Sequence, residues 1–397
     1  MNSIRSLRAL LAAGCLLAPL SAPAGHHGDT ALAREHPQFD TQDIFAFPAP
    51  EGKKTVFALT FNPKGKAGDA ATFGAKGLYN IHIGADANLS KGLTFTVTYK
   101  GTHVHVYESS SAFPEMSKKG TLIGETEIGK PQTLKNGMRV WTATVQDPFP
   151  GNGAGIGLLK KAAAEGKFDA DAFATPGNLF AKGVSGGIVL EVPNSLLPEK
   201  IHYCASTAAE IEPGHWHRIN RIGHVLLPHL YLADEQQKEI QDSSDISTDL
   251  ERKSKVVAVI EKYTALAGAQ KDPKAYAEAW AARILPDSVP YTVGTPAAYK
   301  LPDLNGRALS DNAMDTAVEI LVGKPFPANS GEPDKFTKEF PSSLRPNNGL
   351  RAAPAWLDLQ ICKNPIGRGG RFPGWLYMGS ILCRGASKEN SHESQAL

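Results

Sequence analysis

The sequence is short of cysteine and of net charge, and each shortage excludes a class of protein. It has 4 cysteines in 397 residues, too few for a fold held together by a dense disulfide framework. The formal net charge is only +2, and Arg5 and Arg8 account for that excess in a leading segment without acids. Because the rest of the chain is neutral, we expect no nucleic-acid partner.

Long apolar runs are also missing. No segment after residue 24 approaches 18 uninterrupted apolar residues, so we expect no transmembrane segment in the mature chain. The run Leu10–Leu20 is too short to span a bilayer, and it lies between two arginines and Ala22-Pro23-Ala24. A positive start, an apolar run and a small-x-small site are typical of a cleavable secretory signal.

We therefore expect residues 1–24 to be a signal peptide cleaved after Ala24, and the mature protein to lie in the periplasm or outside the cell. The alternative is a lipoprotein site at Cys15, which ranks second. Ala12 stands where a larger aliphatic residue is usual in such a site, and apolar residues flank Cys15 on both sides.

Three cysteines follow the expected cleavage site. Cys362 and Cys383 close one short loop in a tail rich in glycine and arginine, and we expect them to form a disulfide. Cys204 lies within an apparent strand, where a small buried apolar residue is a simpler interpretation than a reactive thiol.

The pattern of the first half predicts strands. Thr55 to Phe61, Leu78 to Ile83 and Arg139 to Gln146 alternate or are rich in β-forming residues, and helical spacing appears only later, around Val256 to Tyr263 and from Pro273 to Arg283. We expect a mainly β fold with added helices (α+β): a β-sandwich-like body, with the helices concentrated in the C-terminal half. One β-rich domain should span residues 25–341, followed by an irregular tail over 342–397.

A hairpin is the clearest local unit. Leu93 to Tyr99 alternates apolar residues with threonines, and the return strand begins at Thr102 if Lys100-Gly101 forms a two-residue turn. That turn predicts Val97 opposite Val104. It also places His103 and His105 on the threonine face, where a solvated polar surface is the expected role.

The expected cleavage site has a chemical consequence. A mature chain that begins Gly25-His26-His27 offers a terminal amine, two backbone amides and the imidazole of His27, which together form a square-planar site suited to Cu(II) or Ni(II). Cleavage one residue later would make His26 the terminus and change the geometry. The alternative is a solvated terminus without a ligand.

Other histidines extend this metal hypothesis. We consider Asp40, Asp43 and His82 as further ligands near His26 or His27 for a copper, nickel or zinc ion. His215 and His217 flank Trp216 after Pro213-Gly214 and, with Arg221, are candidates for contact with a small ligand.

Several segments, taken in order, resemble the secreted bacterial family catalogued as domain of unknown function 4331 (DUF4331). The resemblance covers roughly residues 25 to 341, and its motifs are His27, Asp40-Thr41-Gln42-Asp43-Ile44-Phe45-Ala46-Phe47, Leu78-Tyr79-Asn80-Ile81-His82-Ile83, Asp147-Pro148-Phe149, Ile188-Val189-Leu190-Glu191-Val192-Pro193, Arg221-Ile222-Gly223, and Asn305-Gly306-Arg307 with Asp311 and Asp315. It implies export and a largely β fold, and it implies no activity.

Three functional hypotheses follow. The leading one is an exported binding or interaction protein that holds a divalent transition metal and meets a small ligand or an envelope protein. The second is a secreted hydrolase or oxidoreductase whose site combines His82, His215, His217 and Arg221. It ranks lower because no nucleophile motif stands out, and the sequence has no His-Glu-x-x-His or phosphate-loop motif. The third is a structural component of the envelope.

Overall fold

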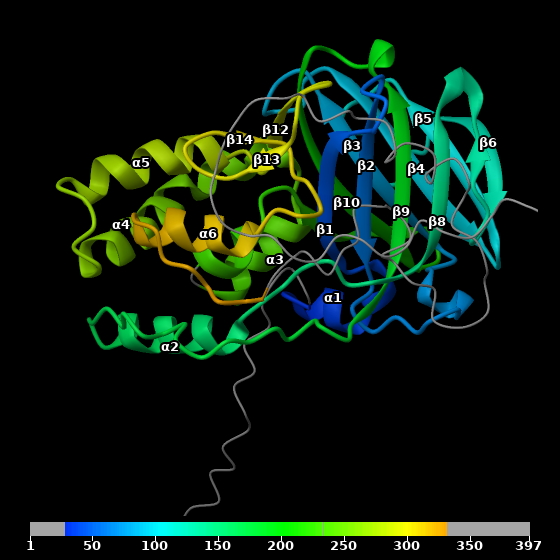
Figure 1. The fold of residues 1–397 in the computed structure, drawn as a ribbon. Coiled ribbons are helices and arrows are strands. Elements are labelled where there is room, and N and C mark those ends of the chain that lie inside the picture. The colour runs from blue at the N-terminus through cyan, green and yellow to red at the C-terminus, as the bar shows by residue number, and fades with distance from the viewer. Residues whose placement is uncertain (1–27, 233, 332–397) are drawn as a thin grey trace, which may run out of the picture. The chain divides into compact units, whose positions relative to one another are not determined.

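A computed structural model describes residues 28–232 and 234–331, and these form two large antiparallel sheets and one small one, with helices added mainly in the C-terminal half (Figure 1). The β-rich α+β fold expected from the sequence is confirmed. The described residues belong to one compact unit. The predicted domain end at residue 341, the tail, the signal peptide and the pair Cys362 and Cys383 lie outside the described residues.

The first sheet has five strands, in the order β1 (Thr41–Pro48), β2 (Lys54–Phe61), β9 (Val184–Pro193), β8 (Arg139–Gln146) and β7 (Gln132–Thr133). The second has seven strands. Its main path is β11 (His215–Ile222), β10 (Lys200–Glu212), β3 (Gly77–Gly84), β4 (Gly92–Lys100), β5 (His103–Ser109) and β6 (Thr121–Glu127), and β12 (Val289–Thr292) pairs with β10. A small third sheet pairs β13 (Ala298–Tyr299) with β14 (Leu304–Asn305).

The two large sheets share a core because their alternate side chains point toward each other. Phe61 of β2 packs against Tyr79 of β3 with ring centroids 4.3 Å apart, and Phe57 meets Tyr203 of β10 at 5.9 Å. Tyr99 of β4 reaches across to Thr142 of β8 with an oxygen–oxygen distance of 2.8 Å. These contacts fix which face of each strand is inward.

The β4–β5 hairpin forms, but with a different register from the predicted one. Val97 lies opposite Val106 and Tyr99 opposite Val104, a shift of two residues, because the turn is Gly101-Thr102. Gly101 has φ +62°, and its lack of a Cβ suits it to the first turn position, where φ must be positive. A shift of two preserves the faces, so His103 and His105 do lie on the outer, threonine-bearing face.

Four α-helices lie in the described chain after residue 234: α3 (Glu235–Ser243), α4 (Lys253–Leu266), α5 (Pro273–Ile284) and α6 (Ala313–Val322). Two helices lie earlier in the chain, α1 (Ala31–Glu35) and α2 (Gly153–Ala164). Short helical segments of other types include η1 (Pro37–Phe39), η5 (Leu227–Tyr231) and η6 (Ile246–Arg252). Asp272 caps α5, and Gly323 ends α6 with φ +82°. No helix in the described part of the chain is long and apolar enough to cross a membrane.

Candidate functional site

The amino-terminal end of the described chain is attached to a buried carboxylate. The backbone N–H of Gly28 donates to Oδ2 of Asp40 at 2.6 Å, and Nη1 of Arg34 donates to the carbonyl oxygen of Gly28 at 2.9 Å. Asp40 is fully buried, and its Oδ1 accepts a hydrogen bond from Nδ2 of Asn220 at 2.8 Å. Because hydrogen bonds to a charged acceptor are strong, the chain enters the fold at a defined point directly after His27.

The local sequence explains how Gly28 reaches Asp40. Gly28 has φ +63°, which a glycine adopts without strain. Thr30 then caps α1, its Oγ1 accepting from the N–H of Ala33 at 3.2 Å. One turn of α1 and the short η1 reverse the chain, so that Asp40 comes back beside Gly28 just before β1 begins.

Three more buried side chains surround this attachment, and with Asp40 we name them the amino-terminal cluster: Asp29, Asp40, His229 and Asp242. His229 of η5 places Nδ1 3.3 Å from Oδ1 of Asp29. Asp242 of α3 lies close enough to Asp29 and Asp40 for their charges to act on it. The cluster therefore joins the amino terminus, the start of β1, η5 and α3.

Burial shifts the pKa of two side chains in the amino-terminal cluster. Removal from water raises the pKa of Asp242 well above its ordinary value, and the nearby charges of Asp29 and Asp40 raise it further. Burial also lowers the pKa of His229, although its contact with Asp29 opposes this. Both carboxyl oxygens of Asp242 and Nε2 of His229 have no hydrogen-bond partner among the described residues, so they can bind a further polar group.

The described residues do not form a metal centre by themselves. Within residues 28–232 and 234–331, no three His, Cys, Asp or Glu side chains are grouped so that they could hold a metal ion. A metal bound here would need ligands from outside these residues. The predicted ligands His26 and His27 lie outside the described part of the chain.

Asp43 does not join Asp40 in the cluster. Its Oδ1 lies 2.6 Å from Nη1 of Arg307, whose guanidinium packs 4.2 Å above the ring of Phe45. Asp43 and Phe45 are two residues apart on β1 and share the face that points away from the second sheet. The expected grouping of Asp43 with Asp40 is therefore absent, because strand alternation turns Asp43 toward a different partner.

His82 does not belong to the amino-terminal cluster either, and its buried ring has polar neighbours of its own. Its Nδ1 lies 2.9 Å from Oγ1 of Thr94 and 3.0 Å from the carbonyl oxygen of Ala112, and its Nε2 lies 2.8 Å from Oγ of Ser206. Burial lowers the pKa of His82 to about 3, and the charge of Arg218 adds to this shift. With both nitrogens occupied, His82 has none available for a metal ion.

The residues of the enzyme hypothesis are not brought together. His215 and His217 are exposed on β11, whereas His82 is 1% exposed on β3. Arg221, also on β11, is fully buried in an ion pair. Two of the four candidate residues therefore face solvent, and the other two have internal partners.

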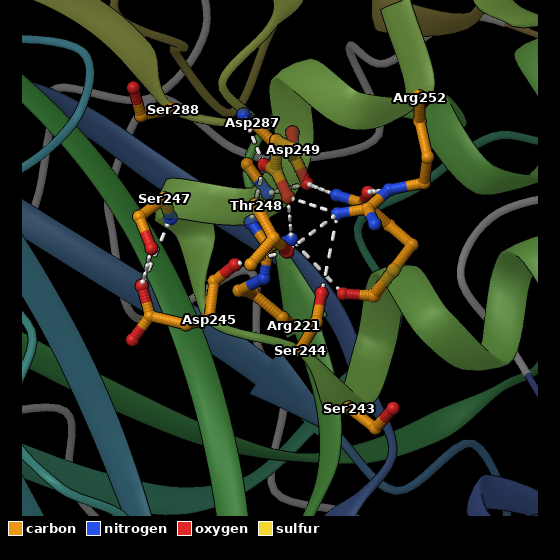
Figure 2. A network of polar contacts seen from close by, with 12 residues as sticks. Arg221, Ser243, Ser244, Asp245, Ser247, Thr248, Asp249, Arg252, Asp287 and Ser288 are labelled. Carbon is orange, nitrogen blue, oxygen red and sulfur yellow. Dashed lines mark hydrogen bonds and ion pairs between the residues drawn. The ribbon is translucent and has the colours of Figure 1, made fainter.

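The partner of Arg221 is Asp249, at the centre of a polar network that the sequence analysis missed (Figure 2). Nη1 and Nη2 of Arg221 meet the two carboxylate oxygens of Asp249 at 2.9 and 2.6 Å. Arg252 adds a contact to Oδ1 of Asp249 at 2.6 Å, and the backbone N–H of Asp287 donates to Oδ2 at 2.8 Å. The network ties η6 and the segment before β12 to the second sheet.

One signal in the sequence points toward this network. Arg218-Ile219-Asn220-Arg221-Ile222 places arginines between apolar residues of a strand, and such a pattern indicates charges carried into the interior. It does not indicate the partner, because Asp249 lies 28 residues further along the chain.

Comparison with protein-family models, curated proteins and solved structures finds no match for this chain.

Proposed function

We propose that this chain is an exported protein that binds Cu(II) or Ni(II) at the amino terminus created by signal cleavage. The observation that carries the proposal is the 2.6 Å hydrogen bond from the N–H of Gly28 to Asp40. A chelate built from Gly25, His26 and His27 uses the terminal amine, two amides and one imidazole. Gly28 contributes the first amide that this chelate leaves free, and that amide is bound to the folded body.

The amino-terminal cluster supports the same location. Asp242 and His229 have buried polar atoms without partners among the described residues. Buried polar atoms are nearly always hydrogen-bonded, so a group bound at the terminus has acceptors and donors beside it. In this proposal Asp40 positions the terminal segment, since both of its carboxylate oxygens already accept hydrogen bonds.

Export is part of the proposal, because an uncleaved chain has no free amine at Gly25. The signal-like segment before Gly25 supports export, and so does the ordered resemblance to DUF4331. Zinc is the weaker candidate at this site, because it prefers a tetrahedral set of ligands to a planar one.

The test uses the mature protein, exported and purified without a tag, with its amino terminus identified by mass spectrometry. We expect one equivalent of Cu(II) or Ni(II) and the visible absorption of planar nitrogen coordination. His27→Ala should abolish this binding because it removes the imidazole ligand. His26→Ala is the matched control and should retain it, since that position supplies only its backbone amide.

Three outcomes would overturn the proposal. The first is a mature terminus other than Gly25. The second is less than stoichiometric metal after titration with copper and nickel. The third is equal binding by His27→Ala and His26→Ala. Stoichiometric zinc without copper or nickel would also contradict the planar chelate.

A further inference from the structure

The five-stranded sheet has an apolar outer face, which is unusual for a sheet surface turned toward water. In β8, Thr142 points inward, where it contacts Tyr99 and donates to the carbonyl oxygen of Gly187 at 2.8 Å. Its neighbours Trp141 and Ala143 therefore point outward. The apolar cluster on this face, which we name the outer apolar face, consists of Phe45, Ala49, Val56, Ala58, Trp141, Ala143, Val145 and Val189.

The outer apolar face is buried rather than exposed. Phe45 is 1% exposed, and Val56, Trp141 and Val189 are each 4% exposed. From beyond the sheet, the described residues add the half-buried Leu309 and the buried Pro148 to this face. Arg307 covers the ring of Phe45. One leucine, one proline and one arginine are too small to bury a face that includes a tryptophan and a phenylalanine, which each have 150–250 Å² to bury, so roughly 300–500 Å² between them.

The described chain ends close to this face. Nδ2 of Asn152, shortly after β8, donates to the carbonyl oxygen of Ala328 at 3.0 Å. The N–H of Gly177 donates to the carbonyl oxygen of Asn329 at 3.1 Å. Gly331, the last described residue, therefore follows directly on a segment held at Asn152, three residues after Phe149, whose ring lies 5.9 Å from the guanidinium of Arg307 that covers Phe45.

The residues that come next have suitable length and composition. Residues 332–360 follow Gly331 directly in the sequence. At about 3.3 Å per residue they can extend for about 95 Å, whereas strands in a sheet are only about 4.8 Å apart. Their large apolar side chains are Phe336, Phe340, Leu344, Leu350, Trp356, Leu357 and Leu359.

We propose that residues 332–360 dock across the outer apolar face and act as its cover. This proposal is independent of the metal hypothesis, because it concerns the opposite face of β1 from Ile44 and Ala46, which lie in the inter-sheet core. It assigns the face to a segment of the same chain. A second copy of the chain and a different protein are the competing occupants.

Photo-crosslinking in the full mature chain tests the proposal. Phe47 is half-buried at the margin of the face, and Phe47→p-benzoylphenylalanine replaces one aromatic side chain with another. We expect adducts within one chain, on peptides from residues 332–360. Tyr107→p-benzoylphenylalanine, on the outer face of the other sheet, is the matched control and should give none on these peptides.

Mixing isotopically light and heavy chains separates the occupants. Adducts between light and heavy chains would assign the face to a second copy and overturn the proposal, as would adducts confined to residues 361–397 or no adducts at all. A second measurement uses dye binding: Trp356→Lys should increase the fluorescence of a hydrophobic dye relative to the wild type. Trp216→Lys, at a half-buried tryptophan of β11, should not. Equal increases in the two variants would count against the proposal.

Discussion

The guanidinium of Arg221 and the carboxylate of Asp249 form a two-point ion pair in which neither side chain is exposed to solvent. The pair links β11, an edge strand of the second sheet, to η6 (Figure 2). The benefit of such a pair depends on both partners being present, because a single buried charge is costly.

Removal of one partner should therefore destabilise the fold strongly. We expect Arg221→Met to lower the free energy of unfolding by about 3–5 kcal/mol, as measured by urea denaturation. The double variant Arg221→Met with Asp249→Leu should lose less than the sum of the two single losses. Arg283→Met is the control, because its contact with the exposed Asp303 at 3.7 Å should contribute about 0–1 kcal/mol. A loss as small as that in Arg221→Met would contradict the assignment.

The lowered pKa of His82 predicts that the folded protein loses stability in acid. Its pKa is lowered to about 3 in the folded state, from an ordinary value of 6.5. Below pH 6.5 the unfolded chain therefore binds a proton at His82 that the folded chain does not bind. The stability contributed by His82 is complete above pH 6.5 and falls progressively toward pH 3. His82→Gln, which does not titrate, should show a shallower decline in urea unfolding over this range. Parallel profiles would show that His82 does not control it.

The raised pKa of Asp242 predicts that the folded protein loses stability as the pH rises, the opposite of the effect of His82. Because its pKa is raised in the folded state, the stability it contributes is complete below the ordinary value of 3.8 and is lost as the pH rises. Asp242→Asn should consequently be more stable than the wild type, with a gap that widens from pH 4 to pH 7. Thermal unfolding at both pH values measures this gap. Asp303→Asn, at an exposed site, should show none.

Cysteine counting tests the disulfide expected from the sequence. Cys204 is fully buried, and burial raises the pKa of its thiol, so it should not react with a thiol reagent in the folded protein. If Cys362 and Cys383 are paired, the unreduced mature chain should titrate no thiol when folded and one in denaturant. Three thiols in denaturant would exclude the pair, and one in the folded state would place Cys204 in contact with solvent.

The strands were predictable because their alternation is local. β2, β3, β4 and β8 follow from patterns within eight or nine residues, and the capping signals of α5 and α6 are equally local. The register of the β4–β5 hairpin was missed by two residues, since the predicted turn placed Gly101 second and the structure needs it first. α3 was not predicted, because Glu235–Ser243 contains a single large apolar residue, Ile240.

The candidate site was less predictable than the fold, for a physical reason. Asp40, Asp43 and His82 have the side chains of metal ligands, but their partners, Gly28, Arg307 and Ser206, are set by packing between distant segments. Asp40 accepts a hydrogen bond from Gly28, and its expected proximity to His26 or His27 stays a prediction, because those residues lie outside the described part of the chain. The roles of Asp242 and His229 could not be expected from the sequence, because they depend on how deeply α3 and η5 are buried.

The arrangement of β8, with threonines inward and apolar residues outward, has a consequence for the order in which the protein is made. Every strand that carries the outer apolar face precedes Pro193, whereas the proposed cover begins at residue 332. In any process that makes or exports the chain amino terminus first, this apolar surface forms long before its proposed cover. We therefore expect a period in which this surface needs a chaperone, and in which aggregation competes with folding.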